Sequence, residues 1–276
     1  MKVKFGTSGN PPSFFTSEYG KNRVNAVDWI NSIGLNAYER MMTYGARMRE
    51  EDAIELGKRA RKHDVSLSVH GPYYVVLTSE KPRVIENSIK EMIKTIHLSD
   101  LMGAKKIVFH PGFGKDYNKV IKNLKIIEKH KPKHVKILPE TMGKISQLGD
   151  LNEVLKICEN TESEPCIDFG HLHARNLGSL KEKEDFRKIL IEIEKRLGRK
   201  SIKNLHCHFY PVDYGEKGEI RHRAVHEENV YPVFEPFAEV ITEFKIYPTL
   251  ISESRDSQDI GALHMQKVMK NLGHGI

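Results

Sequence analysis

Short apolar segments alternate with longer amphipathic stretches along this chain, and no other feature of the sequence constrains the fold as strongly. The apolar segments predict strands at Val3–Gly6, Ala37–Met41, Ser66–His70, Lys106–His110, Lys136–Glu140, Cys166–Phe169, Leu205–Phe209 and Thr249–Glu253. The stretches between them have helical periodicity, and several end at a glycine, as left-handed helix C-caps prefer. Eight strand–helix units in 276 residues predict a closed parallel (β/α)8 TIM barrel, a fold that typically takes about 250 residues.

The sequence disfavours the other common α/β architecture, a doubly wound sheet. Such a sheet usually has fewer strands and a glycine-rich phosphate loop after the first strand. Neither G-x-G-x-x-G nor G-x-x-x-x-G-K-[ST] occurs in the chain. We therefore predict a single α/β barrel domain over residues 1–276. Its longest irregular stretch, residues 210–233, lies between the seventh and eighth predicted strands, and a loop of this length in a compact barrel is usually functional.

Composition limits the class of protein further. The chain is 39% apolar and 29% charged, which excludes collagen-like and disordered chains. Three cysteines argue against a disulfide framework and for a reducing compartment. No apolar run approaches the roughly 20 residues that a bilayer requires, and no signal peptide is evident at the N-terminus. We expect a cytoplasmic monomer without membrane contact; its net charge of +7 is compatible with a polyanionic partner but is also common in lysine-rich proteins.

The C-terminal ends of the predicted strands have an unusual series of polar groups. Seven consecutive strands have a carboxylate or an imidazole at or near their C-terminal end: Glu39, His70, His110, Glu140, Asp168, His208 and Glu253. Barrel active sites are assembled at these ends, and buried charge is costly unless it is paired or bound to a metal. The series therefore predicts a centre for two or three divalent ions. Imidazole and carboxylate ligands without thiolate suit Zn²⁺, with Mn²⁺, Fe²⁺ or Co²⁺ as alternatives.

Five short motifs around these residues occur in chain order. They are Ser68-Val69-His70-Gly71-Pro72-Tyr73, Phe109-His110-Pro111-Gly112, Pro139-Glu140-Thr141, Asp168-Phe169-Gly170-His171 and Ile251-Ser252-Glu253-Ser254. Together they resemble the endonuclease IV family of zinc-dependent AP endonucleases, within the xylose-isomerase-like barrels, over essentially the whole chain. The resemblance implies DNA containing abasic sites as the partner. It also implies hydrolysis of the phosphodiester 5′ to the abasic site by a metal-bridging hydroxide.

The same resemblance implies a role for each strand-end residue. The ligands of the first two zinc ions would be His70, His110, Glu140, Asp168, His208 and Glu253. Glu140 would bridge the two ions and is the predicted catalytic residue. A third zinc would be held by His171 and His222, but Ile220 stands where the family has an aspartate. Residues that could replace this carboxylate or reach the ion are Glu219, Asp213, His173 and His226.

Two residues could support the ligands from beside or beneath them. His206 and His208 point to the same side of their strand, and His208 lies nearer the C-terminal end, so we expect His206 one layer deeper as a hydrogen-bond donor. Glu39 could hydrogen-bond a ligand histidine or a bound water. Alternatively, Glu39 pairs at the barrel rim with Arg40 or Arg47.

Two further residues could contact substrate. Tyr73 could stack on a base, or it could simply pack against Tyr74 and Pro72. Arg221 could attract phosphate at the mouth of the site, or it could belong to a solvated charged loop.

Two other functions remain open from the sequence. Glu140, Asp168, His208 and Glu253 also match the single-metal site of sugar or sugar-phosphate isomerases and epimerases in the same superfamily, and the missing aspartate favours that interpretation. His70 and His110, in the motifs of the third and fourth strands, favour the nuclease instead. A relative that binds DNA or metal with degraded catalysis is the third possibility.

Overall fold

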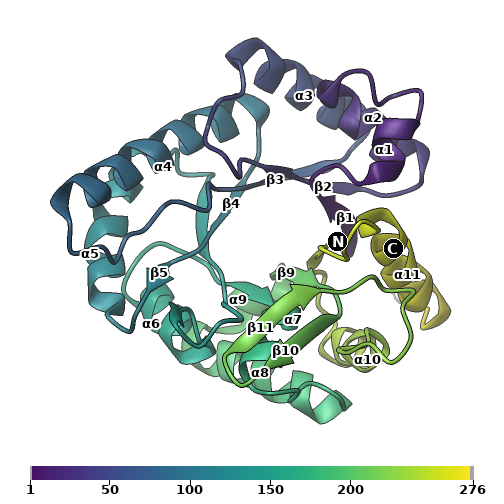
Figure 1. The fold of residues 1–276 in the computed structure, drawn as a ribbon. Coiled ribbons are helices and arrows are strands. Elements are labelled where there is room, and N and C mark those ends of the chain that lie inside the picture. The colour runs from purple at the N-terminus through teal and green to yellow at the C-terminus, as the bar shows by residue number, and fades with distance from the viewer. Residues whose placement is uncertain (1, 274–276) are drawn as a thin grey trace.

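The wall of the barrel consists of eight parallel strands around a central axis (Figure 1). In the computed structural model, which describes residues 2–273, these strands are β1 (Lys4–Ser8), β2 (Ala37–Met41), β3 (Ser66–His70), β4 (Lys106–Phe109), β6 (Lys136–Pro139), β8 (Cys166–Asp168), β9 (His206–Phe209) and β12 (Thr249–Ser252). Their order is β6-β4-β3-β2-β1-β12-β9-β8, and a parallel bridge between Glu140 and Cys166 joins the two edge strands. The predicted TIM barrel is confirmed. The first strand is Lys4–Ser8 rather than Val3–Gly6, and four predicted last residues of strands instead follow them directly: His110, Glu140, Phe169 and Glu253.

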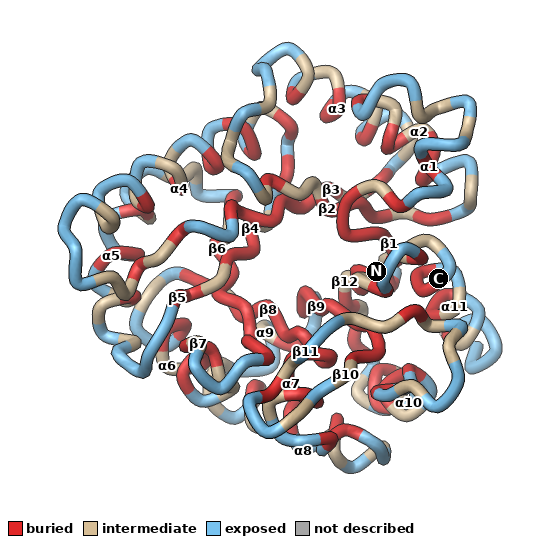
Figure 2. The backbone as a smooth tube through the Cα atoms, viewed as in Figure 1, coloured by how far each residue is buried: buried red, intermediate tan, exposed pale blue. Residues whose placement is uncertain are grey.

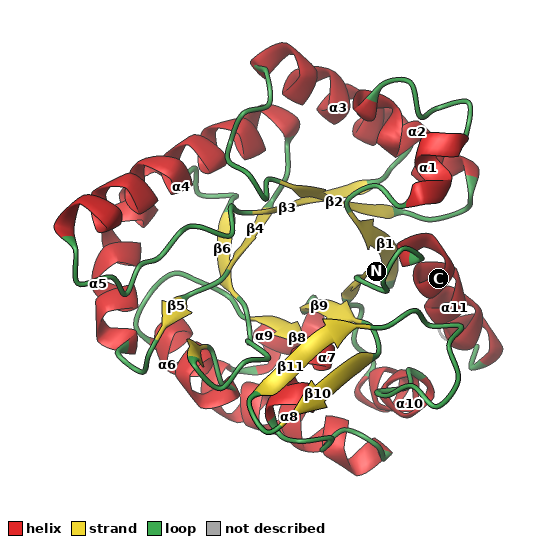
Figure 3. Ribbon diagram, in the orientation of Figure 1, coloured by secondary structure: helices red, strands yellow, loops and turns green. Residues whose placement is uncertain are grey.

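Helices surround the strands on the outside of the barrel (Figure 3). They are α1 (Pro12–Thr16), η1 (Arg23–Asn25), α2 (Ala26–Ser32), α3 (Glu50–Lys62), α4 (Pro82–Met102), α5 (Tyr117–Ile127), η2 (Glu128–His130), α6 (Leu151–Glu159), α7 (Phe169–Arg175), α8 (Lys183–Leu197), α9 (Arg199–Lys203), α10 (Glu235–Phe244) and α11 (Gln258–Asn271). Buried residues lie on the sides of the helices that face the barrel, as amphipathic periodicity predicts (Figure 2). The longest helix, α4, ends at Gly103 in the left-handed conformation. Among residues 2–273, the structure has no helix with the length and apolarity needed to cross a bilayer.

The stretch expected to be irregular between the seventh and eighth barrel strands contains an antiparallel hairpin instead. Its strands are β10 (Val212–Gly215) and β11 (Gly218–His222), and the hairpin lies beside the barrel mouth (Figure 1). A two-residue turn, with Gly218 at a φ of +87°, allows the chain to reverse. The prediction that residues 210–233 are irregular throughout was therefore wrong. A second small ribbon pairs β5 (Gly112–Phe113) with β7 (Gln147–Leu148).

Aromatic side chains pack behind the two strands that supply Asp168 and His208. The cluster consists of Phe169, Phe186, Phe209, Phe234 and Phe237. The Phe169 and Phe237 rings are closest, with centroids 4.2 Å apart, and all five side chains are buried. Phe169 follows Asp168 directly and Phe209 follows His208, so the cluster fixes the backbone from which both polar side chains project.

Candidate metal centre

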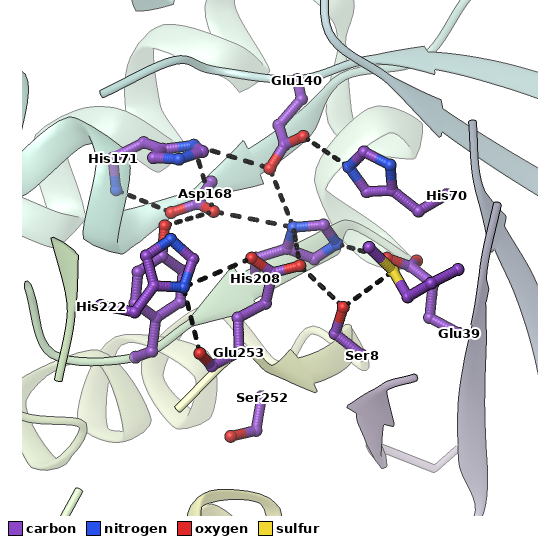
Figure 4. A network of polar contacts seen from close by, with 12 residues as sticks. Ser8, Glu39, His70, Glu140, Asp168, His171, His208, His222, Ser252 and Glu253 are labelled. Carbon is purple, nitrogen blue, oxygen red and sulfur yellow. Dashed lines mark hydrogen bonds and ion pairs between the residues drawn. The ribbon is translucent and has the colours of Figure 1, made fainter. Parts of the chain in front are cut away.

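Most of the predicted metal ligands meet at the C-terminal mouth of the barrel (Figure 4). They come from different strands or from the residue after a strand: His70 from β3, His110 after β4, Glu140 after β6, Asp168 and His208 from β8 and β9, and Glu253 after β12. Glu39, predicted to support the ligands, lies in β2. These strand-end positions meet because parallel strands present their carboxyl ends at one face of the barrel. His70, Glu140, Asp168 and His208 are buried, and His110 and Glu253 are half-buried.

Glu140 lies at the centre of this group. Its Oε2 atom is 3.1 Å from His70 Nε2 and 3.1 Å from His110 Nε2, and its Oε1 atom is 2.9 Å from His208 Nδ1. Burial alone would raise the pKa of Glu140, but the charge of His208 and the hydrogen bond from His110 outweigh it, so the pKa lies well below its usual value. One carboxylate oxygen therefore faces His70 and His110, and the other faces His208. A carboxylate placed in this way can bridge two metal ions.

Asp168 and His171 form the neighbouring part of the centre. Asp168 ends β8 and caps α7, where its Oδ1 accepts a 2.7 Å hydrogen bond from the His171 amide. Asp168 Oδ2 lies 3.2 Å from His171 Nδ1 and accepts a 3.0 Å hydrogen bond from the Tyr210 hydroxyl. Burial alone would lower the pKa of His171, but Asp168 and Glu219 raise it to about 10. The imidazole is thus held between two carboxylates.

The structure distinguishes between the two candidate replacements for the missing aspartate. Glu219 Oε2 lies 3.3 Å from His171 Nε2, and Glu219 Oε1 lies 3.4 Å from His222 Nε2. Asp213 pairs instead with Arg221 and Arg223, at 2.8 and 2.7 Å. Glu219 therefore provides the carboxylate beside the two histidines.

A β-bulge explains why Glu219 rather than Ile220 faces the centre. Asp213 pairs with Arg221 and Tyr214 with Glu219, so Ile220 is an extra residue in β11 without a partner in β10. In a regular strand, residues three apart point to opposite faces, whereas one extra residue returns them to the same face. Glu219 and His222 consequently share a face, and Ile220 is 64% exposed.

The donor atoms of these residues have the chemistry and the spacing that metal ions require. The donor atoms within each of four groups lie within 4.8 Å of one another: His70, His110 and Glu140; Glu140, Asp168 and His171; His171, Glu219 and His222; Glu39, His208 and Glu253. Imidazole nitrogens and carboxylate oxygens are the ligands that Zn²⁺ and similar ions use. The first three groups are linked because adjacent ones share Glu140 or His171, so the structure offers a connected series of ligand groups.

Glu39 and His206 lie beneath the ligands, in the interior of the barrel. Glu39 Oε2 accepts hydrogen bonds of 2.8 Å from both Ser68 Oγ and His206 Nε2, and Glu39 Oε1 lies 2.9 Å from His208 Nε2. Burial lowers the pKa of His206 to about 4. Glu39 therefore supports His208 from below, and the alternative rim pairing with an arginine is not what the structure shows.

The remaining predicted residues lie around the mouth. The Tyr73 ring stacks on His110, with centroids 4.9 Å apart, and meets His70 edge-on while staying 47% exposed. Arg221 is exposed and paired with Asp213, outside the ligand groups. Neither His173, whose Nδ1 accepts a hydrogen bond from the Leu180 amide, nor His226, which is exposed, belongs to these groups.

Several residues of the site were not identified from the sequence. Ser8 Oγ donates a 2.9 Å hydrogen bond to Glu253, and the Tyr210 ring stacks on His222 with centroids 3.9 Å apart. Both follow the pattern of the ligands, because Ser8 ends β1 and Tyr210 follows β9, so position at a strand end could have indicated them.

A cleft of about 700 Å³ opens above the ligands and reaches Glu253 and His222. Its other walls include Arg23, Arg47 and Tyr44, which also were not identified, and the Tyr44 side chain is 81% exposed. Positive and aromatic side chains therefore line the entrance, whereas carboxylates and imidazoles form the floor.

The fold and this cluster define a TIM-barrel protein with a candidate metal centre at the C-terminal ends of its strands. The chain belongs to the xylose isomerase-like TIM barrel family, whose model matches residues 27–271. The sequence-based resemblance to the endonuclease IV proteins of this superfamily is confirmed by the relatives described next.

Individual relatives and solved structures agree with this membership. The uncharacterized protein MJ0133 of Methanocaldococcus jannaschii is 34% identical over 259 residues, which is 91% of each chain. The "Probable endonuclease 4" of Aquifex aeolicus is 29% identical over 57% of this chain, and the match spans 59% of that protein's length. Endonuclease IV from Thermus thermophilus has the same fold, with a TM-score of 0.73 at 17% identity over 98% of this chain and 100% of its own. So does a D-tagatose 3-epimerase-like protein, with a TM-score of 0.70 at 18% identity over 98% and 96%.

Proposed function

We propose that this protein is a divalent-metal-dependent endonuclease that hydrolyses the phosphodiester 5′ to abasic sites in DNA. The observation that supports it best is the shared position of Glu140. Its Oε2 atom faces His70 and His110, and its Oε1 atom faces His208 Nδ1, which also lies 3.6 Å from Asp168 and 3.5 Å from Glu253. A single-ion enzyme needs only one such group, whereas closely spaced ions suit displacement at phosphorus. Similarity to a relative named as a probable endonuclease 4 supports the same class of reaction.

The ligand set implied by the resemblance, together with the contacts of Glu140 and His208, supports distinct tasks for these residues. His70, His110 and Glu140 would hold one ion, and Glu140 with Asp168, His208 and Glu253 a second. A third would lie between His171, Glu219 and His222. When bound, such ions activate a water and neutralise charge on the phosphate. Candidate metals are Zn²⁺, and Mn²⁺, Fe²⁺ or Co²⁺ as alternatives.

The entrance would select and orient the DNA. Arg23 and Arg47 in the cleft supply positive charge that attracts the phosphate backbone. Tyr73 is half-exposed and rests on His110, so its free face is available for a base or for the exposed sugar of the lesion. An abasic nucleotide leaves the helix more easily than a paired one, which would give selectivity without base-specific contacts.

One experiment tests the proposal directly. Metal per chain is measured by elemental analysis of the purified protein, and the same sample is assayed on a duplex with one synthetic abasic site. We expect two or three ions and incision on the 5′ side of the lesion, with an undamaged duplex of the same sequence left intact. One ion, no incision and Mn²⁺- or Co²⁺-dependent conversion of a ketose would instead assign the chain to the sugar isomerases and epimerases. Tight binding of abasic DNA without turnover in any divalent metal would indicate a relative that has lost catalysis.

Replacing Glu219 is expected to remove one ion and leave the others. The Glu219→Gln protein should contain about one ion fewer per chain than the wild type, because His171 and His222 alone are too few ligands for a stable site. The matched control is Asp213→Asn, which makes the same change of charge in the same hairpin and should leave metal content unchanged. Loss of an ion from Asp213→Asn but not from Glu219→Gln would show that this assignment is wrong.

A further inference from the structure

A second polar cavity lies at the opposite end of the barrel, where the strands begin. Its volume is about 330 Å³, and its lining includes Lys2, Lys4, Lys105, Lys106, Asn204 and His206. Lys4 is the first residue of β1, Lys106 is the first residue of β4, and His206 is the first residue of β9. The cavity therefore faces away from the mouth that contains the candidate metal centre.

Positive charge in this cavity has little compensation. Among the described residues, 2–273, no carboxylate lines the cavity, and Lys2, Lys4 and Lys105 form no ion pair. Lys106 Nζ donates a 2.7 Å hydrogen bond to the Asn204 carbonyl. Lys4 and Lys106 are partly buried, whereas Lys2 and Lys105 are exposed. A partly buried cation is stabilised when an anion or a hydrogen-bond acceptor matches it.

The environment of Lys106 shows the same imbalance. Burial, together with repulsion from Lys4, lowers the pKa of Lys106, and Glu164 is the carboxylate that opposes this shift. Glu164 is already shared, because it also lies 3.5 Å from Lys136 Nζ. An anion in the cavity would relieve the repulsion between the lysines.

The His206 ring provides an independent observation. His206 is 1% exposed, and its Nε2 atom is occupied by the hydrogen bond to Glu39. Its Nδ1 atom is buried and has no hydrogen-bond partner among residues 2–273. In a neutral ring that donates from Nε2, the Nδ1 atom presents a lone pair and needs a donor. Leaving such an atom unpaired costs free energy, so a ligand with a hydrogen-bond donor is favoured here.

We propose that this cavity binds inorganic phosphate in its hydrogen phosphate form. The oxygens without a proton would accept hydrogen bonds from Lys4 and Lys106, and the remaining O–H would donate to His206 Nδ1. Ammonium groups are effective partners for phosphate oxygens. A cavity of about 330 Å³ admits a small anion but excludes duplex DNA, which distinguishes this site from the proposed DNA-binding mouth. The inference is independent of the proposed nuclease activity.

Lysine footprinting of the purified, metal-containing protein tests the location of binding. Amine acylation is measured by mass spectrometry with increasing inorganic phosphate. We expect phosphate to protect Lys4 and Lys106 but not Lys133, an exposed lysine outside the cavity. Sulfate at matched charge and ionic strength is the key comparison, because it has no O–H to donate. Equal protection by sulfate, or no protection by phosphate, would overturn the proposal.

Calorimetry of phosphate binding tests the lysines themselves. Lys106→Met should weaken binding about tenfold or more, the change expected from losing one charge-assisted hydrogen bond. Lys4→Met provides a second variant that keeps the hydrogen bond to Asn204, and both proteins are checked for folding by thermal melting. Lys133→Met is the matched control and should bind like the wild type. Wild-type affinity in both cavity variants would contradict the assignment.

Discussion

Glu140→Gln is expected to reduce incision of abasic DNA by about two to three orders of magnitude while the barrel stays folded, a loss typical of removing one preorganised charged group from an active site. Glu140 is flanked by imidazole nitrogens at 3.1, 3.1 and 2.9 Å from three strands. The glutamine amide has the same shape, but it is neutral and presents a donor where the carboxylate presents an acceptor. It can therefore no longer serve as an anionic bridge between two groups of ligands.

The control for this experiment is Glu86→Gln, the same chemical change on the exposed surface of α4. Glu86 pairs with Lys90 one turn away, and such exposed pairs contribute little to stability. Its incision rate should equal that of the wild type. Circular dichroism melting separates a local loss of activity from unfolding. Wild-type incision by the Glu140→Gln protein would remove Glu140 from the proposed catalytic role.

The barrel could be predicted because its strands are short, apolar and separated by periodic helices. Those signals are local, so they can be recognised without knowledge of tertiary contacts. The hairpin β10–β11 lacks them. Its residues include Asp213, Tyr214, Glu219 and Arg221, which do not alternate between apolar and polar. Packing against Gly143, where a Cβ atom at Gly218 would lie 2.1 Å from the carbonyl oxygen, helps to hold the hairpin in place, and such a contact is not visible in the sequence.

The ligand positions could be predicted for a similar reason, since the ends of parallel strands must meet at one face. The structural details that decide the chemistry of the site could not be predicted from the sequence. The bulge at Ile220 depends on how β11 pairs with β10, and it turns Glu219 rather than Ile220 toward the histidines. Asp213 is excluded because it pairs with Arg221 and Arg223. The depth of Glu39 depends on side-chain orientation inside the barrel, so sequence left rim pairing and support of a histidine equally open. The sequence also left open whether Arg221 attracts phosphate or belongs to a solvated charged loop. In the structure, Arg221 pairs with Asp213, and this pairing offsets its positive charge.

The position of Glu39 makes its replacement costly for stability. It is fully buried, and it contacts Ser68, His206 and His208 through its two carboxylate oxygens. Burial alone would raise the pKa of Glu39, but His208 and His206 outweigh burial and hold it well below its usual value. Because the folded-state pKa is lowered, this stabilisation is present above the unfolded-state pKa of about 4.3 and is lost as the pH falls below it.

Glu39→Gln is therefore expected to lower the free energy of unfolding at pH 7 by about 3–5 kcal/mol. The neutral amide removes the anionic acceptor of His206 and the negative charge 2.9 Å from His208 Nε2. Denaturant titration measures this loss, and the variant should also lose less stability than the wild type when the pH is lowered from about 7 to about 3.

The metal affinity of the Glu39→Gln protein should fall about 10- to 100-fold, as when the group that orients a ligand histidine is removed. Glu50→Gln is the matched control, since Glu50 pairs with His97 on the surface. A Glu39→Gln protein with wild-type stability and metal affinity would show that His208 is held in place by its other neighbours alone.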